Sequence, residues 1–526
     1  MLRLWQWLVA GVVCVLLSWG YAHRVLVAHA ALDRTQRVLV VYDREDPQHG
    51  GRTKIATMQR LLASVGVPSQ TEALAAYHAG QLTGDKYQGV VTLVNTPNDP
   101  VKNAAFFRDR ARFTGRKLHV GQGLSAQEAT QLNATRRLLD HQQVTLRAGS
   151  TWQLLPFKSV ITLLQPTGPQ TKIGTLRASG GGGATYAYGT VVDQAGYLPE
   201  LLTTGVAMTC AMRTVATLFD QAADHAPLLT ITGVTPYSDL ARLRQLSRWL
   251  KAAGIPFAVS TTTVSRNTGL QGFATFTKTL REVETSGGVI FLRVPTGAVA
   301  RTSSGPALEH EMVAQLNQLG QRQVIPVGLS APGTWNQDAV LRSAGLQRAQ
   351  NVLFLPDEEE TLTRHADNLG ATYGQSWFAL QLDQLQTPQT GQGTPTTFAV
   401  PTAVTVPFPQ STRQLTAQLH RLQDLQVTWY APQRELTAEL TSASATFAYR
   451  RGTYQLNGQT VAVSTTNAGI PNYHFTRPTQ VTMQNYFKYQ GWVLLTFFSL
   501  TTVVLVGFLV VGRRLYRRKF FRQDKQ

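Results

Sequence analysis

The stretch LLTITGVTPYSDLARLRQLSRWLKAAGIPFAV, from Leu228 to Val259, contains the pattern on which the architecture depends. It begins with an apolar run typical of a buried strand, and a turn around Pro236 follows. Leucines then recur at three- and four-residue spacing from Leu240 to Leu250, which predicts an amphipathic helix. Because a second apolar run ends the stretch, we expect a strand, a helix and a second strand parallel to the first.

The same pattern recurs between residues 211 and 432, where several apolar runs are typical of buried strands. The predicted strands are 228–232, 256–260, 288–294, 323–329, 351–355, 397–406 and 426–430, and the predicted helices are 239–253, 272–286, 306–320, 337–348 and 411–424. The stretch 368–396 is rich in Gly, Thr and Gln and is predicted to be a loop over one rim. These repeated units predict a parallel (β/α)7 barrel rather than a sandwich.

Three further blocks flank the barrel in the α/β fold that we expect. Residues 31–150 alternate apolar strands with helices, which predicts a small α/β domain of Rossmann or flavodoxin-like layout. Residues 151–210 indicate a β-rich linker subdomain, and residues 433–488 indicate a β-rich juxtamembrane module. In this last block, Asn457-Gly458 lies between alternating apolar residues and predicts a tight hairpin.

Apolar runs at both ends of the chain predict a membrane protein. Residues 491–512 carry no charge, are numerous enough to span a bilayer, and precede the basic tail 513–526. The positive-inside rule places this tail in the cytoplasm and the bulk of the chain outside it, at the cell membrane. The apolar run within residues 1–30 is either a cleaved signal peptide or a signal anchor that remains as a transmembrane helix.

The formal net charge of +19 is high, and much of it is scattered along the body of the chain. Such a surface suits an anionic polymer or a membrane surface. No basic helix is interleaved with aromatic residues, which argues against nucleic acid as a partner. The two cysteines, Cys14 and Cys210, form no zinc-binding pattern, and we expect no disulfide between them because the membrane segment separates them.

The turn after the first barrel strand resembles one family. The matching residues are Val234, Thr235, Pro236, Asp239, Leu240, Gly254, Ile255, Pro256 and Phe257. This pattern resembles the polysaccharide-deacetylase-like family DUF2334, and the resemblance covers roughly residues 210 to 432. It implies the distorted barrel of carbohydrate-esterase deacetylases, and some relatives look like membrane-anchored parts of exopolysaccharide operons.

The resemblance also implies a chemistry that this sequence has lost. In that family an aspartate acts as general base, while a second aspartate and a His-x-x-x-His pair hold a divalent metal. The aspartate pair aligns with Thr232 and Gly233, and the histidine pair aligns with Arg293 and Gly297. Glycine has no side chain and arginine does not ligate metals. The resemblance therefore implies a degenerate active site with no catalytic residue, no metal and no cofactor.

Three other residues are expected to contact a substrate. A later motif of the family aligns with GLSAPGTW (328–335), in which Ser330 occupies the polar position. Tyr237 and Trp335 are expected at the rim, where an aromatic ring could stack on a sugar, and a structural role for both stays open.

Two groups of residues are weaker candidates for a metal site. His310 and Glu311 are neighbours on one predicted helix, so both cannot face one metal well. Asp43 and His49, with two acids between them, follow the first strand of the N-terminal block. We interpret the first group as a solvent-facing pair and the second as a polar turn.

Three functions remain open at this point. The first is a membrane-anchored, extracytoplasmic pseudoenzyme that binds or guides a cell-surface polysaccharide or exopolysaccharide during synthesis or export. The second is an active carbohydrate N- or O-deacetylase with an unusual site, which would need zinc or another divalent metal. The third is an assembly component that binds proteins of a glycan-synthesis complex, such as an integral-membrane glycosyltransferase.

Overall fold

The computed structural model describes residues 36–46, 50–83, 87–96, 101–180, 182–295, 305–357, 365–385, 397–425, 427–462 and 483–520. The chain divides into two compact units, the first ending at Thr466 and the second beginning at Asn467. The first unit holds all the described strands, in a closed barrel and three further sheets. The second unit holds one long helix.

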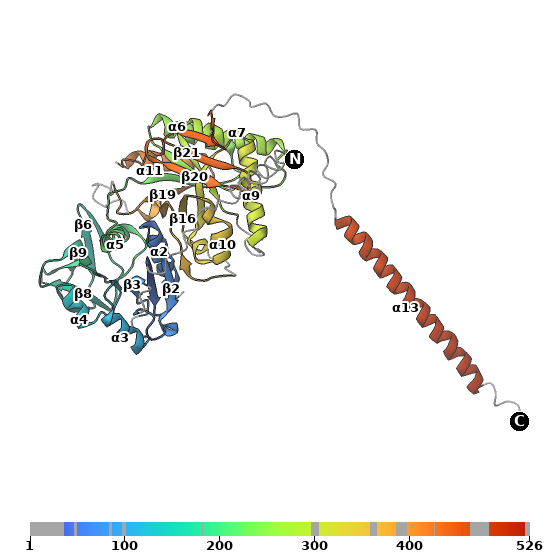
Figure 1. Cartoon of the computed structure of the whole chain (residues 1–526), viewed down its shortest axis with the longest axis horizontal. Coiled ribbons are helices and arrows are strands. Elements are labelled where there is room, and N and C mark those ends of the chain that lie inside the picture. Colours follow the sequence, from blue (N-terminus) through green and yellow to red (C-terminus); the bar gives the residue numbers. More distant parts are fainter. Residues whose placement is uncertain are drawn as a thin grey trace, which may run out of the picture. The chain divides into compact units, whose positions relative to one another are not determined.

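Seven parallel strands close into a barrel within the first unit (Figure 1). In barrel order they are β12 (Leu228–Val234), β13 (Phe257–Thr261), β14 (Gly288–Arg293), β15 (Pro326–Pro332), β16 (Asn351–Leu355), β18 (Gln375–Gln381) and β19 (Thr402–Pro407). The last strand closes the ring by pairing in parallel with the first. The intervening helices include α6 (Leu240–Ala252), α7 (Gln271–Thr285), α9 (Gly305–Gln321), α10 (Ala339–Ala344) and α11 (Thr412–Asp424).

The predicted seven-stranded parallel barrel is confirmed, but one of its strands was assigned to the wrong stretch. Residues 427–430 are not a strand, and β18 supplies the remaining strand from the stretch 368–396 that was predicted to be a loop. Of the described residues 427–430, only Tyr430 is buried. The Tyr430 ring packs edge-on against the indole of Trp377, with ring centroids 4.8 Å apart.

Side chains fill the interior of the barrel. The Ser260 and Ser330 hydroxyls lie 2.7 Å apart although β14 separates their strands, so both point inward. The register pairs Ser330 with Leu353 and Leu353 with Trp377, which places all three on the inner face. Trp377 is only 1% exposed and is the largest fully buried side chain among the described residues.

A ten-stranded sheet contains both N-terminal blocks that the sequence suggested. Its parallel part has the order β2 (Ser69–Ala73), β1 (Arg37–Tyr42), β3 (Tyr87–Leu93), β4 (Arg116–Val120) and β11 (Ala195–Leu198). Antiparallel strands continue it as β10 (Thr185–Val192), β9 (Thr171–Ala178), β6 (Val144–Ala148) and β7 (Thr151–Leu154). At the other edge, the short strand β17 (Leu369–Gly370) pairs with β2. Because β17 lies between two barrel strands in the chain, it joins the barrel to the sheet.

Helices and a small ribbon complete this part of the first unit. The helices are α2 (Gly51–Ser64), α3 (Ala104–Arg112), α4 (Ala126–Gln131) and α5 (Gly205–Leu218). Strands β5 (Ala134–Asp140) and β8 (Val160–Pro166) pair as a separate antiparallel ribbon. The order of the five parallel strands is that of a common doubly wound sheet.

A four-stranded antiparallel sheet follows the barrel in the chain. Its strands are β20 (Thr437–Thr441), β21 (Thr446–Arg450), β22 (Thr453–Leu456) and β23 (Gln459–Val461). The predicted hairpin at Asn457-Gly458 is confirmed, since both residues have the positive φ that a tight hairpin needs. The Tyr454 hydroxyl donates a hydrogen bond to the Gly288 carbonyl at 3.2 Å. This sheet therefore packs on the barrel rather than forming a separate module.

Glu284 on α7 makes the stability of the first unit depend on pH. Its side chain is buried and accepts a hydrogen bond from the Ile325 amide at 3.1 Å. Burial raises its pKa from 4.5 to about 8, although Arg281 and the amide oppose this. Between pH 4.5 and about 8, the folded chain therefore binds more protons than the unfolded chain. The free energy of unfolding should fall as pH rises there, by up to about 1.4 kcal/mol per pH unit.

We expect Glu284→Gln to remove most of this pH dependence, because glutamine keeps the shape and does not ionise. Urea unfolding of the full-length chain in detergent, at a series of pH values between 5 and 8, measures how the free energy of unfolding changes with pH. This range lies between the ordinary and the raised pKa of Glu284. A slope that the substitution leaves unchanged would show that other groups cause it.

The second unit contains α13 (Met483–Phe520). Its segment Gln490–Leu515 is long and apolar enough to cross a membrane, by length and composition. This agrees with the predicted transmembrane helix 491–512. The N-terminal segment 1–30, predicted to be a signal peptide or anchor, lies outside the described residues.

Candidate functional site

A site is expected at the carboxyl ends of the barrel strands, because in a parallel barrel the functional residues lie in the loops that follow the strands. We call this end of the barrel, with the loops that follow the strands, the barrel mouth. The sequence placed the degenerate catalytic positions here. The structure describes those positions except Gly297, which lies outside the described residues.

Thr232 and Gly233 lie at the end of β12, where the strand is irregular. The pairing register with β13 shifts between Ile231 and Val234. Gly233 is exposed with φ +80°, and an added Cβ would meet no atom within 4 Å. The left-handed backbone, rather than lack of space, therefore favours glycine at this position. Thr232 is half-buried and carries no group that can act as a base near neutral pH.

Ser330 and Arg293 are paired neighbours at the ends of β15 and β14. Ser330 is fully buried, and its hydroxyl is hydrogen-bonded to that of Ser260. It therefore offers no exposed surface to a substrate, in contrast to the predicted contact. Arg293 is half-buried. Threonine, glycine and arginine do not form a ligand set for a divalent metal, so the residues present do not fit the metal that members of the resembled family hold.

The two aromatic residues predicted at the rim have different environments. Tyr237 is 90% exposed on the turn between β12 and α6, where its ring is free to meet a ligand. Trp335 is only 2% exposed, so the prediction that it lies at the rim is wrong. Its ring packs against Gly345, where an added Cβ would lie 2.7 Å from the indole. Trp335 is a core residue of the loop that follows β15.

The loop around Trp335, residues 333–338, joins the barrel to the ten-stranded sheet. The Asn336 side chain donates to the Ala371 carbonyl at 2.9 Å and accepts from the Ala371 amide at 3.2 Å. Asp338 caps α10 and accepts a hydrogen bond from the His365 amide at 2.8 Å. These bonds hold the segment that carries β17 to the loop after β15, and β17 itself pairs with β2 of the sheet. The motif thus has a structural role that its sequence does not reveal.

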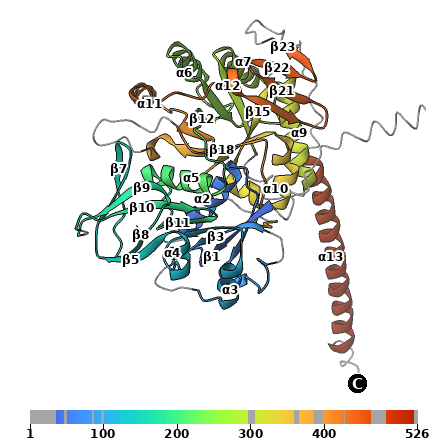
Figure 2. The ribbon, with the colours of Figure 1, turned by 60° about the vertical axis from the view of Figure 1, so that its left-hand side comes forward.

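Arg60 of α2 closes one sector of the barrel mouth. Its guanidinium lies 4.5 Å from the centre of the Phe378 ring and donates to the Phe354 and Ala379 carbonyls, at 3.4 and 3.2 Å. These carbonyls lie near the carboxyl ends of β16 and β18. Figure 2 shows α2 between the sheet and the barrel. Helix α2 therefore covers the mouth over these two strands.

The surroundings of Arg60 keep it charged although it is fully buried. Burial lowers the pKa of its guanidinium to about 10, and the charge of nearby Asp357 opposes this. Burial raises the pKa of Asp357, which accepts a hydrogen bond from the Thr334 amide at 2.8 Å. An added Cβ on Gly333 would lie 2.8 Å from Arg60 Cγ, so glycine allows this close approach.

Two of the weaker metal candidates, Glu311 and Asp43, accept hydrogen bonds from other residues, and His49 lies outside the described residues. Glu311 accepts hydrogen bonds from Ser265 Oγ at 2.9 Å and Gln315 Nε2 at 2.8 Å, whereas His310 is exposed. Asp43 accepts hydrogen bonds from the backbone amides of residues 44, 95 and 96 and from the Thr96 hydroxyl. Within the described ranges, no three His, Cys, Asp or Glu side chains are grouped so that they could hold a metal ion.

A polar cluster at the carboxyl edge of the parallel sheet was not found from the sequence. Lys158 pairs with the buried Glu200 at 2.5 Å, and both line a small cavity of about 30 Å³ with Lys54. Burial and the charge of Lys158 lower the pKa of Lys54. The strand order alone could have indicated this edge, since doubly wound sheets bind ligands beyond the carboxyl ends of their strands. The cavity admits little more than a water molecule.

No family model matches this chain, and no curated protein matches its sequence.

Proposed function

We propose that this protein is a membrane-anchored, extracytoplasmic polysaccharide-binding protein whose deacetylase-like barrel has lost catalysis. It binds or guides a cell-envelope polysaccharide during synthesis or export. The observation that carries this proposal is the chemistry of the barrel mouth. Thr232, Gly233 and Arg293 occupy the positions where the resemblance expects a base and metal ligands, and Ser330, which pairs with Arg293 across the strands, is hydrogen-bonded to Ser260 in the barrel interior.

The covered sector of the mouth supports binding without chemistry. A deacetylase must bring an acetyl group against an activated water at the strand ends, and α2, which covers β16 and β18, narrows the room for a substrate at this end of the barrel. The turn after β12 stays accessible and presents the exposed ring of Tyr237. An exposed aromatic ring can hold the apolar face of a sugar without any reactive group.

The apolar helix and the basic tail support the proposed location. A chain held by the segment Gln490–Leu515, with the arginines after it in the cytoplasm, would keep the barrel outside the cell and close to the membrane. Polymers that emerge from a membrane synthase pass through this region. The basic body of the chain favours polymers that carry negative charge.

Binding by the full-length chain in detergent tests this function. The probes are polygalacturonate, polyglycerol phosphate, poly-N-acetylglucosamine and dextran, and acetate release from the acetylated polymer is followed with and without zinc. We expect a polymer to bind and no acetate to be released. Zinc-dependent acetate release would instead establish an active deacetylase, and no binding to any polymer would reject the proposal.

Tyr237→Ala is expected to weaken binding of the polymer about 2- to 10-fold, since an exposed aromatic contact is worth ~0.5–1.5 kcal/mol. The melting temperature should not change, because the side chain is 90% exposed. Tyr237→Phe is the matched control and should keep the affinity, because it retains the ring. Equal affinities for the wild-type chain and the alanine variant would exclude Tyr237 from the binding surface.

A further inference from the structure

We infer that a basic pocket between the ten-stranded sheet and the barrel binds an anionic group of the polymer. This inference rests on the proposed function and names the substrate class: a polysaccharide that carries carboxylate or phosphate groups. The pocket has a volume of about 520 Å³, which lies within the ~300–1,000 Å³ range of small-ligand sites. It is separate from the barrel mouth and was not suggested by any sequence motif.

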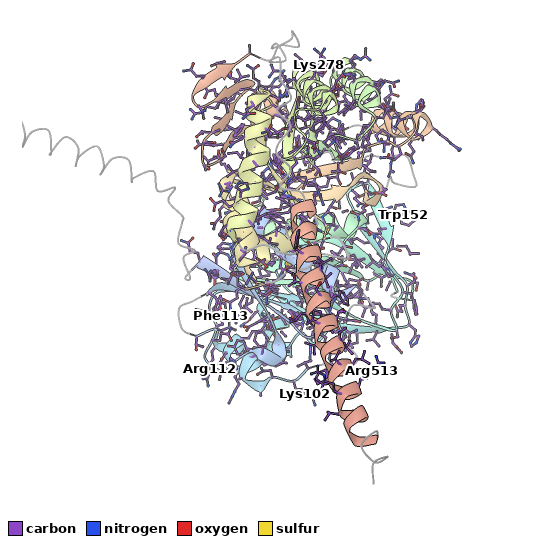
Figure 3. The ribbon with its side chains drawn as sticks, turned by 90° about the vertical axis from the view of Figure 1, so that its right-hand side faces the viewer. Lys102, Arg112, Phe113, Trp152, Lys278 and Arg513 are labelled. Carbon is purple, nitrogen blue, oxygen red and sulfur yellow. The ribbon has the colours of Figure 1, made fainter. Side chains whose placement is uncertain are left out.

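Four parts of the first unit line this pocket. They are the turn between β6 and β7, the beginning of β9, the first turns of α5, and barrel residues before β19. Trp152, labelled in Figure 3, directly follows the lining residues of the β6–β7 turn. A site built from elements so far apart in the sequence exists only in the folded unit.

The charge of the lining selects for an anion. Arg147, Lys172 and Arg213 line the pocket, and none of its described lining residues is acidic. Arg213 pairs with Asp224 at 2.7 Å, but no ion pair occupies the exposed side chains of Arg147 and Lys172 within the described part of the chain. Two cations on adjoining strands are therefore available to a ligand. Arginine can bind a carboxylate or phosphate through two parallel hydrogen bonds.

The first turn of α5 adds to this preference. The helix begins at Gly205, and both Gly205 and Val206 line the pocket. The side chain of its N-cap residue, Thr204, makes no capping hydrogen bond, and Gln153 Oε1 instead accepts a hydrogen bond from the Ala207 amide at 2.9 Å. The first amides of a helix lack partners within the helix, and they carry the positive end of the helix dipole. The helix thus adds to the positive field of the basic side chains.

Among the described residues, Cys210 is the only thiol that lines the pocket, and it does not add reactivity. Its side chain is buried, and burial raises the pKa of the thiol to about 12. The thiol therefore stays protonated near neutral pH and is a poor nucleophile. The residues that line the pocket therefore offer groups that bind an anion, and they offer no reactive group.

The test compares two double variants of the full-length chain in detergent. One removes both available cations of the pocket, as Arg147→Gln with Lys172→Gln. The matched control removes two cations elsewhere on the same part of the unit, as Arg137→Gln with Arg177→Gln, neither of which lines the pocket. Calorimetric titration uses polygalacturonate for the carboxylate, polyglycerol phosphate for the phosphate, and dextran as a neutral polymer. Inorganic phosphate is the probe for the anion alone.

We expect the pocket variant to bind one of the anionic polymers at least about tenfold more weakly, since two charge-assisted hydrogen bonds are lost. The control should bind within about twofold of the wild-type chain, and both variants should keep its melting temperature, because surface substitutions change stability little. Which polymer loses affinity distinguishes a carboxylate from a phosphate ligand.

The remaining outcomes separate this inference from the proposed function. If the wild-type chain binds a polymer and the pocket variant binds it equally well, the pocket is not the site, while the proposed function stands. If no polymer binds but inorganic phosphate binds and depends on the two cations, the anion pocket is real and the proposed function fails. Absence of any binding would overturn both.

Discussion

Replacing Arg60 with alanine is expected to destabilise the contact between α2 and the barrel by about 3 kcal/mol. The substitution removes a buried cation that two strand carbonyls and Asp357 surround, and it leaves the Phe378 ring without its partner. The helix should then separate from the strand ends more often. Amide hydrogen exchange in α2 and β17 of the full-length chain should accelerate about 100-fold, since 1.4 kcal/mol is a factor of ten.

Two further variants show which property of Arg60 is responsible. Arg60→Met keeps the packing against Phe378 without the charge, and we expect a loss of only about 1–2 kcal/mol. Arg52→Ala on the same helix is the exposed control, because its pairing with Glu45 is at the surface, and it should cost less than about 0.5 kcal/mol. If exchange in the Arg60→Ala variant matches that of the control, α2 does not hold the barrel mouth closed.

Replacing Trp377 with alanine should cost about 3–5 kcal/mol of unfolding free energy, because it empties the largest side chain from the barrel interior. The loss also removes the contact between Trp377 and Tyr430. Thermal unfolding of the full-length chain in detergent, followed by circular dichroism, measures the effect. This measurement tests whether β18, a strand that the sequence pattern did not predict, contributes to the core of the barrel.

Trp152→Ala is the control for loss of a tryptophan. Trp152 is half-buried on β7, the last strand at one edge of the ten-stranded sheet (Figure 3), and we expect a cost of about 1 kcal/mol. If Trp377→Ala costs no more than this control, β18 does not contribute the core of the barrel.

The barrel could be predicted because its evidence is local. The leucine stripe of α6 and the apolar runs beside it follow helix and strand periodicity within single segments. The strand β18 has the same apolar character, but the glycines, threonines and glutamines around it are typical of loops. The run 426–430 has the composition of a strand, yet among its described residues only Tyr430 is buried, and its ring packs against Trp377.

The contacts at the barrel mouth could not be predicted, because they join parts of the chain about 300 residues apart, as from Arg60 to Phe354. Thr57, Arg60 and Ser64 share one buried face of α2 at helical spacing. A stripe of polar residues does not indicate an interface in a sequence. Trp335 was expected at the rim, but its ring packs against Gly345 at the end of α10, a contact that the motif itself does not indicate.

The pocket that we assign to an anion also has a non-local origin. Arg147, Lys172 and Arg213 are single basic residues in three separate elements, and none belongs to a motif. Only the high net charge indicated a preference for anionic partners, and it did not indicate where such a partner would bind.

Metal content is the most direct test of the claim that the barrel has lost its catalytic site. The purified full-length chain is incubated with zinc, dialysed and examined by elemental mass spectrometry. We predict that no stoichiometric metal remains, because Thr232, Gly233 and Arg293, which stand where the resemblance places the base and metal ligands, do not form a ligand set. Near-stoichiometric zinc that survives dialysis and is removed by a chelator would contradict this account and restore the deacetylase hypothesis.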